Sequence, residues 1–445
     1  MKVSVVGTGY VGLVSGVCLA AKGHQVTCVD IDADKVSKIN QGMSPIYEEG
    51  LDELLQQTVG QQLKATTDLR QAVLSTDLSI IAVGTPFDGS VIDLRYIKEV
   101  AEQIGTVLKD KPSYHLVVVK STVVPGTTDD IVRPILESAS GKQAGPDFGV
   151  GMNPEFLKEG EAIKDFMAPD RIVLGGIDAR SIQLLGELYS VFEDVDKLET
   201  SCKTAEMIKY TANSLLATMI SFANEIGNLC TALGGIDVVD VMEGVHLDKR
   251  LSPILSDGTR IRPSFTSYIE AGCGFGGSCF PKDVKALIAH GKRAGEPMQL
   301  LESVIRVNLE QPNQLIRLLK KHSPDVNNLR VAILGLAFKP GTDDIRESPA
   351  LPVMQSLLEL GAQIKAYDPI ALEPTKDLFK DSAVVFCDRL EQAIDDAQAI
   401  VLVTRWPEFS ALPDLLAKLP AQPLVIDGRR MLDKENVARY DGIGL

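Results

Sequence analysis

Short apolar runs alternate with longer helical stretches along the first two hundred residues of the chain. Residues 3–6 form an apolar run that ends at a glycine, and a helical stretch then continues to about Lys22, where Gly23 ends it. A second run covers residues 25–29, and further runs follow at residues 78–83, 116–119 and 171–174. Because strands and helices alternate in this order, the pattern predicts a mostly parallel, doubly wound α/β sheet.

The pattern changes between residues 204 and 233, where no proline occurs and Gly227 is the first glycine. One long helix is expected there, either as a spine between domains or as a dimer contact. Glu206, Lys209 and Asn213 are spaced so that they share one face of this helix. That face is either solvated or forms an inward-facing polar site, and the spacing leaves both open.

A second α/β pattern begins near Leu329, with strands expected at residues 330–334, 363–367, 399–403 and 423–426. The expected fold is two Rossmann-like doubly wound domains joined by a long central helix or helical domain, at residues 1–200, 201–310 and 311–445. The second module lacks a GxGxxG motif, so no second dinucleotide is expected there. Lys339 and Arg346 in its first strand-to-helix loop suit phosphate binding, and a solvated loop is the alternative.

The first strand leads into a glycine motif, Gly7-x-Gly9-x-x-Gly12, that opens the first helix. These glycines allow a tight turn, a close approach of the main chain to a pyrophosphate, and close packing of helix on strand. Asp30 closes the second strand, where it is placed to accept hydrogen bonds from the adenosine ribose. Its charge favours NAD over NADP, a preference that Lys35 softens.

A cysteine segment, residues 274–283 (GFGGSCFPKD), places Cys279 between a glycine run and a proline that suits a first helical turn. A helix N-terminus and the Lys282 ammonium group both favour the thiolate, which is the nucleophilic form of cysteine. Asp283 adds a carboxylate that can act as a general acid, as a general base or as a group that orients a reactant. The segment is interpreted as a loop that presents a nucleophilic thiol. The alternative is a buried structural cysteine.

Composition excludes several other classes of protein. The net charge of −15 argues against a nucleic-acid partner. Seven scattered cysteines form no CxxC pair and no Cys/His ligand set, so neither a disulfide framework nor a metal site is expected. No apolar run approaches the ~20 residues of a membrane helix and no leader is recognised, so a cytoplasmic protein without a membrane partner is expected.

Together these motifs resemble the UDP-glucose/GDP-mannose dehydrogenase family nearly from end to end. The resemblance rests on the glycine motif with Asp30, on residues 83–86, 121–128, 153–160, 206–213 and 335–349, and above all on the cysteine segment. It implies NAD-dependent, four-electron oxidation of a nucleotide-sugar C6 alcohol to a carboxylate. Cys279 would carry a thiohemiacetal and then a thioester.

The resemblance also implies the roles of individual residues. Lys209 and Asn213 would stabilise the oxyanion at C6, Asp283 would orient or activate water, and Glu155 with Thr122 would serve thioester hydrolysis. The implied cofactor-binding residues are Gly7, Gly9, Tyr10, Val11, Gly12, Asp30, Lys35, Thr85, Pro86, Ser121, Thr122, Glu159, Lys282 and Arg346. The implied substrate-binding residues are Glu155, Phe156, Leu157, Lys158, Lys209, Asn213, Arg260, Tyr268, Gly276 and Lys339.

Family members dimerise through the central helix, and an arginine crosses into the partner's site. A homodimer is therefore expected, but Arg262 stands where the family has glycine, so either Arg260 or Arg262 is the crossing residue. Phe280 and residues 169–171 favour UDP-glucose over GDP-mannose, whereas residues 141–151 resemble the GDP-mannose branch. Another UDP-sugar also remains open.

Two more distant functions are compatible with parts of the chain. A two-electron β-hydroxyacid dehydrogenase would use a Lys-x-x-x-Asn pair such as Lys209 and Asn213, but it would leave Cys279 and the third domain without a role. A non-catalytic NAD-binding scaffold would make the cysteine segment accidental. The number of NADH molecules formed per substrate separates all three.

Overall fold

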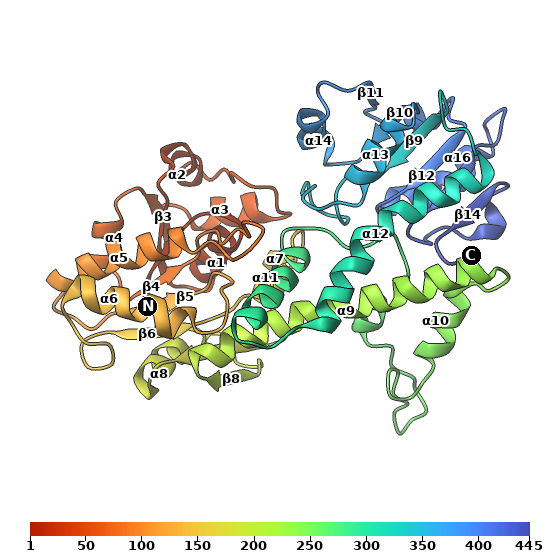
Figure 1. Cartoon of the computed structure of the whole chain (residues 1–445). Coiled ribbons are helices and arrows are strands. Elements are labelled where there is room, and N and C mark those ends of the chain that lie inside the picture. The colour runs from red at the N-terminus through yellow and green to blue at the C-terminus, as the bar shows by residue number, and fades with distance from the viewer. The chain divides into compact units, whose positions relative to one another are not determined.

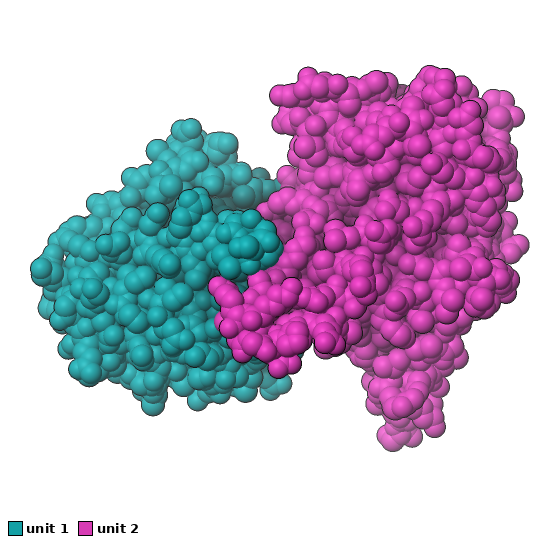
Figure 2. Space-filling model, in the orientation of Figure 1, with its two compact units in different colours: residues 1–212 teal, residues 213–445 magenta.

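An eight-stranded sheet forms the centre of the first of two compact units, residues 1–212, and residues 213–445 form the second (Figure 2). The computed structural model describes residues 1–445. The strand order in the first unit is β3-β2-β1-β4-β5-β6-β7-β8, and only the β6–β7 pair is antiparallel. The strands are β1 (Lys2–Val6), β2 (Gln25–Val29), β3 (Leu63–Thr66), β4 (Leu78–Ile81), β5 (Leu116–Val119), β6 (Gly149–Met152), β7 (Ile172–Gly176) and β8 (Lys197–Thr200).

Helices cover the sheet of the first unit, and two apolar clusters form its core. The helices are α1 (Tyr10–Ala21), α2 (Ala33–Asn40), α3 (Leu51–Thr58), α4 (Leu69–Leu74), α5 (Arg95–Asp110), the π-helical turn η1 (Thr128–Val132), α6 (Arg133–Ser140), α7 (Ala162–Met167) and α8 (Ala179–Leu188). The order reverses between β1 and β4, and this switch point is where open α/β sheets bind ligands at their carboxyl edge.

The second unit contains a six-stranded, wholly parallel sheet with the order β11-β10-β9-β12-β13-β14, the Rossmann order again. Its strands are β9 (Arg330–Leu334), β10 (Gln363–Tyr367), β11 (Val384–Phe386), β12 (Ala399–Leu402), β13 (Leu424–Asp427) and β14 (Tyr440–Gly442). Its helices are α10 (Val238–His246), η2 (Ser264–Tyr268), α11 (Phe280–Arg293), α12 (Gln299–His322), α13 (Ala350–Glu359), α14 (Leu372–Leu378), α15 (Leu390–Ile394), η3 (Pro407–Ala411), α16 (Leu412–Leu416) and η4 (Lys434–Asn436).

Helix α9 (Cys202–Leu233) is one uninterrupted helix of 32 residues that begins in the first unit and ends in the second (Figure 1). The prediction of two doubly wound α/β domains and a long central helix is therefore confirmed. No helix combines the length and the apolar character needed to cross a bilayer.

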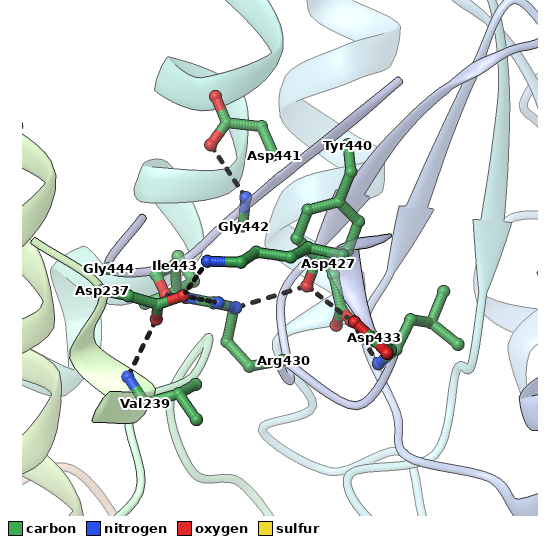
Figure 3. Close-up of polar contacts among 12 residues, drawn as sticks. Asp237, Val239, Asp427, Arg430, Asp433, Tyr440, Asp441, Gly442, Ile443 and Gly444 are labelled. Atoms are coloured by element: carbon green, nitrogen blue, oxygen red, sulfur yellow. Dashed lines mark hydrogen bonds and ion pairs between the residues drawn. The ribbon is translucent and has the colours of Figure 1, made fainter. Parts of the chain in front are cut away.

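A buried ion pair connects Arg430, in the loop after β13, to Asp237 at the N-terminus of α10 (Figure 3). Arg430 Nη2 lies 2.8 Å from Asp237 Oδ2, and Arg430 Nη1 donates to the Ile443 carbonyl at 3.1 Å. Asp237 also caps α10 by accepting from the Val239 N–H. Burial alone would raise the pKa of Asp237, but the hydrogen bonds from Arg430, Val239 and Lys434 lower it to about 2. The carboxylate therefore stays ionised and holds this end of the unit together.

Candidate active site

The turn after β1 has the shape that a dinucleotide requires. Gly7 has φ +96°, and a Cβ there would lie 2.6 Å from the Ala82 carbonyl oxygen. A Cβ on Gly12 would lie 1.9 Å from the Gly7 oxygen, so α1 packs against the turn only with glycine at that position. A Cβ on Gly9 would meet no atom within 4 Å. Gly9 thus leaves open space beside the N-terminus of α1, as a bound pyrophosphate requires.

Asp30 lies at the end of β2, beside the glycine turn. Its Oδ2 accepts hydrogen bonds from Thr8 N at 2.8 Å and Thr8 Oγ1 at 2.5 Å, and Asp32 N donates to its Oδ1 at 3.0 Å. Partial burial favours the neutral acid, but the hydrogen bonds from Thr8 and Asp32 and the charge of Lys35 together lower the pKa of Asp30. The carboxylate is therefore ionised at neutral pH. These residues fit NAD, because an ionised carboxylate accepts from a ribose and repels a 2′-phosphate.

The loops after β4 and β5 are joined at the same edge of the sheet. Thr85 Oγ1 donates to the Thr122 carbonyl at 2.8 Å, and Ser121 Oγ donates to the Val83 carbonyl at 2.7 Å. Four of the predicted positions, Thr85, Pro86, Ser121 and Thr122, are thus brought together beside the switch point.

Glu155 and Lys209 form a buried ion pair in the first unit. Glu155 Oε1 lies 2.8 Å from Lys209 Nζ, and Glu155 Oε2 accepts from the Leu157 N–H at 2.6 Å. Lys209 also lies 5.5 Å from the centre of the Phe156 ring. Burial alone would raise the pKa of Glu155, but the charge and hydrogen bond of Lys209, the Leu157 N–H and the charge of Lys120 together lower it. The site therefore contains a carboxylate that is ionised despite being buried.

The polar stripe of α9 faces inward rather than into solvent. Glu206, Lys209 and Asn213 are all buried. Glu206 accepts from the N–H groups of Gly126 at 2.6 Å and Thr128 at 2.8 Å, which ties the loop after β5 to α9. Burial raises the pKa of Glu206 to about 7.

Two further predicted positions of the first unit, Lys158 and Tyr10, lie at the loop of residues 153–161. Lys158 makes ion pairs with Glu161 at 3.0 Å and Asp165 at 3.3 Å, with half of its side chain exposed. The Tyr10 hydroxyl hydrogen-bonds to the carboxylate of Glu48, a buried residue that sequence reasoning missed.

Cys279 occupies the N-cap of α11, as the sequence predicts. Pro281 lies in the first turn of the helix, and the Asp283 N–H donates to the Cys279 carbonyl at 2.9 Å. Ser278 Oγ lies 3.6 Å from Cys279 Sγ. Residue 279 thus lies at the positive end of the α11 dipole.

Asp283 connects two other predicted residues, Lys282 and Asn213, through its carboxylate. Its side chain is almost fully buried; Oδ1 accepts from Lys282 Nζ at 2.6 Å, and Oδ2 accepts from Asn213 Nδ2 at 2.6 Å. Asn213 lies one turn beyond Lys209 on α9. The carboxylate thus fixes the amide of Asn213 one turn from the Cys279 N-cap.

The loop after β9 lies directly against the glycine run of the cysteine segment. A Cβ on Gly276 would lie 2.3 Å from the Glu347 carbonyl oxygen, and the Gly277 N–H donates to the Arg346 carbonyl at 2.8 Å. Lys339 lies half-buried in the same loop, and the mostly exposed Arg346 side chain pairs with Asp344 at 2.8 Å. The glycines are needed because any side chain would displace this loop.

The second Rossmann-like module has no free ribose-accepting carboxylate. Asp368 ends β10 as Asp30 ends β2, but its Oδ2 accepts from Leu336 N at 2.7 Å, Ala337 N at 3.0 Å and Trp406 Nε1 at 2.9 Å. Its Oδ1 also accepts from the N–H groups of Ile370 at 2.9 Å and Ala371 at 2.8 Å, so this fully buried carboxylate has five protein donors, against three at Asp30.

The segment before the cysteine loop brings one of its predicted residues to the site. The Tyr268 ring lies 6.4 Å from the Phe280 ring, centre to centre. Arg260 Nη1 instead donates to the carbonyls of Leu247 at 2.8 Å and Ser252 at 3.0 Å, and Arg262 pairs with Glu243. Both arginines thus contact residues between 243 and 252 of the same chain.

Comparison with known proteins identifies three consecutive family domains. Models of the UDP-glucose/GDP-mannose dehydrogenase family match residues 1–193 (NAD binding domain), 203–310 (central domain) and 332–434 (UDP binding domain). The chain is 41% identical to UDP-glucose 6-dehydrogenase of Haloferax volcanii, with 100% of both chains covered. It is also 41% identical to GDP-mannose 6-dehydrogenase of Pseudomonas putida over 100% of each. A UDP-glucose dehydrogenase structure from Pyrobaculum islandicum superposes with a TM-score of 0.89 at 38% identity, over 100% of this chain and 97% of that one.

Proposed function

The chain belongs to the UDP-glucose/GDP-mannose dehydrogenase family, and we propose that it oxidises the C6 alcohol of UDP-glucose to give UDP-glucuronate. It is an NAD-dependent nucleotide-sugar 6-dehydrogenase. The observation that carries the four-electron reaction is Cys279 at the N-cap of α11, in the same turn as an Asp283 bound to Asn213. A two-electron dehydrogenase has no use for that thiol.

The glycine turn and Asp30 hold the cofactor in this proposal. Gly9 gives the pyrophosphate room at the N-terminus of α1, and the Asp30 carboxylate accepts from the adenosine ribose. Bound NAD⁺ supplies the hydride acceptor for each of the two oxidations.

Cys279 carries the sugar between the two oxidations. Its thiolate attacks the C6 aldehyde, a C–S bond forms, and the aldehyde oxygen takes up a proton to give a thiohemiacetal. After the second oxidation, water attacks the resulting thioester and the C–S bond breaks. The thiolate is regenerated, and water has supplied the second carboxylate oxygen. Because the aldehyde is captured covalently, it is not released between the steps.

The remaining groups stabilise charge and move protons. Lys209 and Asn213 donate to the negative charge that develops on the C6 oxygen. Glu155, ionised next to Lys209, accepts a proton from the hydrolytic water, which Thr122 and Asp283 help to position. Lys282 partly neutralises Asp283.

UDP-glucose is preferred over GDP-mannose because Phe280 and residues 169–171 match the UDP-sugar branch. Residues 141–151 favour the other branch, and identity to relatives of both kinds is 41%. Residues 156–158, Gly276 and Lys339 line the substrate in this proposal, with Tyr268 and either Arg260 or Arg262. The test is kcat/KM across UDP-glucose, UDP-galactose, UDP-N-acetylglucosamine and GDP-mannose. UDP-glucose should lead by at least tenfold, and a lead for GDP-mannose would replace it as the substrate.

We also propose a homodimer formed through α9. Apolar residues repeat along one side of this helix at alternating spacings of four and three: Leu215, Met219, Phe222, Ile226, Leu229 and Leu233. Leu215, Phe222, Leu229 and Leu233 are more than half exposed in the single chain. Such a seam is the pattern with which one helix packs against another. Light scattering should give twice the mass of one chain, and Phe222→Glu should halve it; a wild-type monomer would contradict the dimer.

A further inference from the structure

Three segments that are distant in sequence meet at the buried carboxylate of Glu48. Glu48 lies in the loop between α2 and α3. Its Oε2 accepts from the Tyr10 hydroxyl and from the Gly160 N–H, the latter at 2.7 Å, and its Oε1 accepts from the Ala162 N–H at 2.7 Å. Tyr10 is the first residue of α1, directly after the glycine turn, whereas Gly160 and Ala162 close the loop that starts at residue 153.

The Glu48 carboxylate is the acceptor in all three of these hydrogen bonds. Both main-chain N–H groups can only donate, so the side chain between them must present an acceptor to each. A carboxylate does so with its two oxygens, whereas an amide would turn an N–H toward one of the two donors. The Gly160 N–H also donates to the Tyr10 hydroxyl, at 2.9 Å, but the Ala162 N–H has Glu48 as its acceptor, and Ile46, Leu157 and Ile163 pack into the apolar core there. The site therefore requires a carboxylate rather than merely a polar residue.

The loop that Glu48 closes is the one that carries the reacting carboxylate. At its start, Asn153 is fixed: its N–H donates to the Val119 carbonyl, and its Oδ1 accepts from Lys120 at 2.9 Å and Tyr189 at 2.5 Å. At its end, Glu48 holds Gly160 and Ala162. Glu155 lies between these two anchors.

We propose that Glu48 is a positioning residue for the oxidation: it fixes the loop of residues 153–161, and with it Glu155, relative to the dinucleotide turn that begins α1. This inference rests on the proposed function, since it assigns Glu155 to the reaction. Glu48 itself touches neither substrate nor cofactor in this role. It acts through the Gly160 and Ala162 main chain on one side and through the Tyr10 hydroxyl on the other.

The test compares Glu48→Gln, which keeps shape but loses one acceptor, with Glu48→Asp, which keeps two acceptors on a shorter side chain. The matched control is Glu49→Gln, the exposed neighbour in the same loop. We expect Glu48→Gln to lower kcat by about 10- to 100-fold, the cost of a misplaced catalytic group, while the Kd for NADH changes less than about threefold. Glu48→Asp should lose less kcat than Glu48→Gln, and Glu49→Gln should match wild type.

Hydrogen exchange at the main-chain amides supplies a readout that does not depend on turnover. Exchange at residues 155–162 should become faster in Glu48→Gln but not in Glu49→Gln. A Glu48→Gln protein with wild-type kcat and unchanged exchange would overturn the inference. So would a lower Tm with kcat per folded enzyme unchanged, because that is the result of a purely structural role. If Glu48→Gln does not fold, wild-type kcat and exchange in Glu48→Asp would overturn it equally. Absence of NADH production by wild type with every nucleotide sugar would instead refute the proposed function, and the exchange result would still decide whether Glu48 holds the loop.

Discussion

Lys209→Met should destabilise the protein far more than loss of an exposed ion pair, because it leaves Glu155 buried without its cation. The side chains of Lys209 and Glu155 are only 4% and 5% exposed, and their charged atoms are 2.8 Å apart. Removal of one partner of a buried pair costs about 3–5 kcal/mol. A loss of about 1 kcal/mol in the free energy of unfolding lowers the Tm of a unit of this size by about 2–4 °C. The Tm of Lys209→Met should therefore fall by roughly 6–20 °C.

The matched control lies two turns earlier on the same helix. Lys203 pairs with Asp130 at 3.2 Å, but the two side chains are 56% and 66% exposed, so Lys203→Met should cost at most about 1 kcal/mol. The double variant Lys209→Met/Glu155→Gln should be more stable than Lys209→Met alone, because no uncompensated charge remains.

The pH dependence of the Lys209 variant gives a second check. The pKa of Glu155 is lowered in the folded protein, so its contribution to stability is present above the ordinary carboxyl pKa, about 4.3, and is lost as pH falls through the folded value. The gap between wild type and Lys209→Met should therefore narrow in acid. Thermal unfolding followed by circular dichroism from about pH 3 to pH 8 measures it. Equal Tm values for the Lys209 and Lys203 variants would refute the reasoning.

Three further predictions concern the thiol, the cofactor turn and Glu206. Cys279→Ser should lower kcat by at least about a thousandfold and leave the Kd for NADH unchanged; normal steady-state turnover would remove the thiol from the mechanism. Gly9→Ala should weaken NADH binding at least about tenfold with little change in Tm. Gly12→Ala, whose Cβ would lie 1.9 Å from a main-chain oxygen, should weaken NADH binding and also lower Tm. Fluorescence titration measures the Kd for NADH and thermal unfolding measures Tm; an unchanged Kd in Gly9→Ala would contradict a cofactor site at this turn. Because the pKa of Glu206 is raised to about 7, its stabilising contribution is complete below the ordinary carboxyl pKa and is lost as pH rises through about 7. The stability gap between wild type and Glu206→Gln should therefore shrink by about 3 kcal/mol between about pH 5 and about pH 8, and a gap that stays as constant as that of the exposed control Glu225→Gln would contradict the raised pKa.

Central strands could be predicted because they are buried along most of their length, and the long helix because its residues include no proline and a single glycine. The strands β9 and β10 begin and end at the predicted residues, and α9 begins two residues before the predicted start. Strands β3, β8 and β11 lack that signal, because about half or more of their residues reach solvent. Strand β6 is buried, but Gly149 and Gly151 interrupt its apolar run; larger side chains there would collide with Leu116 and Leu185.

Some residues of the candidate site could likewise be predicted from the sequence, and others could not. The glycine turn and the cysteine segment were recognisable because their function depends on local backbone geometry and on helix ends. Glu48 was not, since it is a lone acid in a loop and its main-chain partners lie 112 and 114 residues away. The inward orientation of Glu206 also depends on distant N–H donors, in the loop after β5, and no periodicity on α9 could reveal them.

The most direct test of the four-electron reaction is the amount of NADH formed per UDP-glucose at limiting substrate. With excess NAD⁺ and complete consumption of the sugar, absorbance of the reduced cofactor should give two equivalents, and the product should be the carboxylate with no aldehyde detectable by a carbonyl-trapping reagent. One equivalent of NADH with the aldehyde as product would contradict the role of Cys279 and the assignment as a whole.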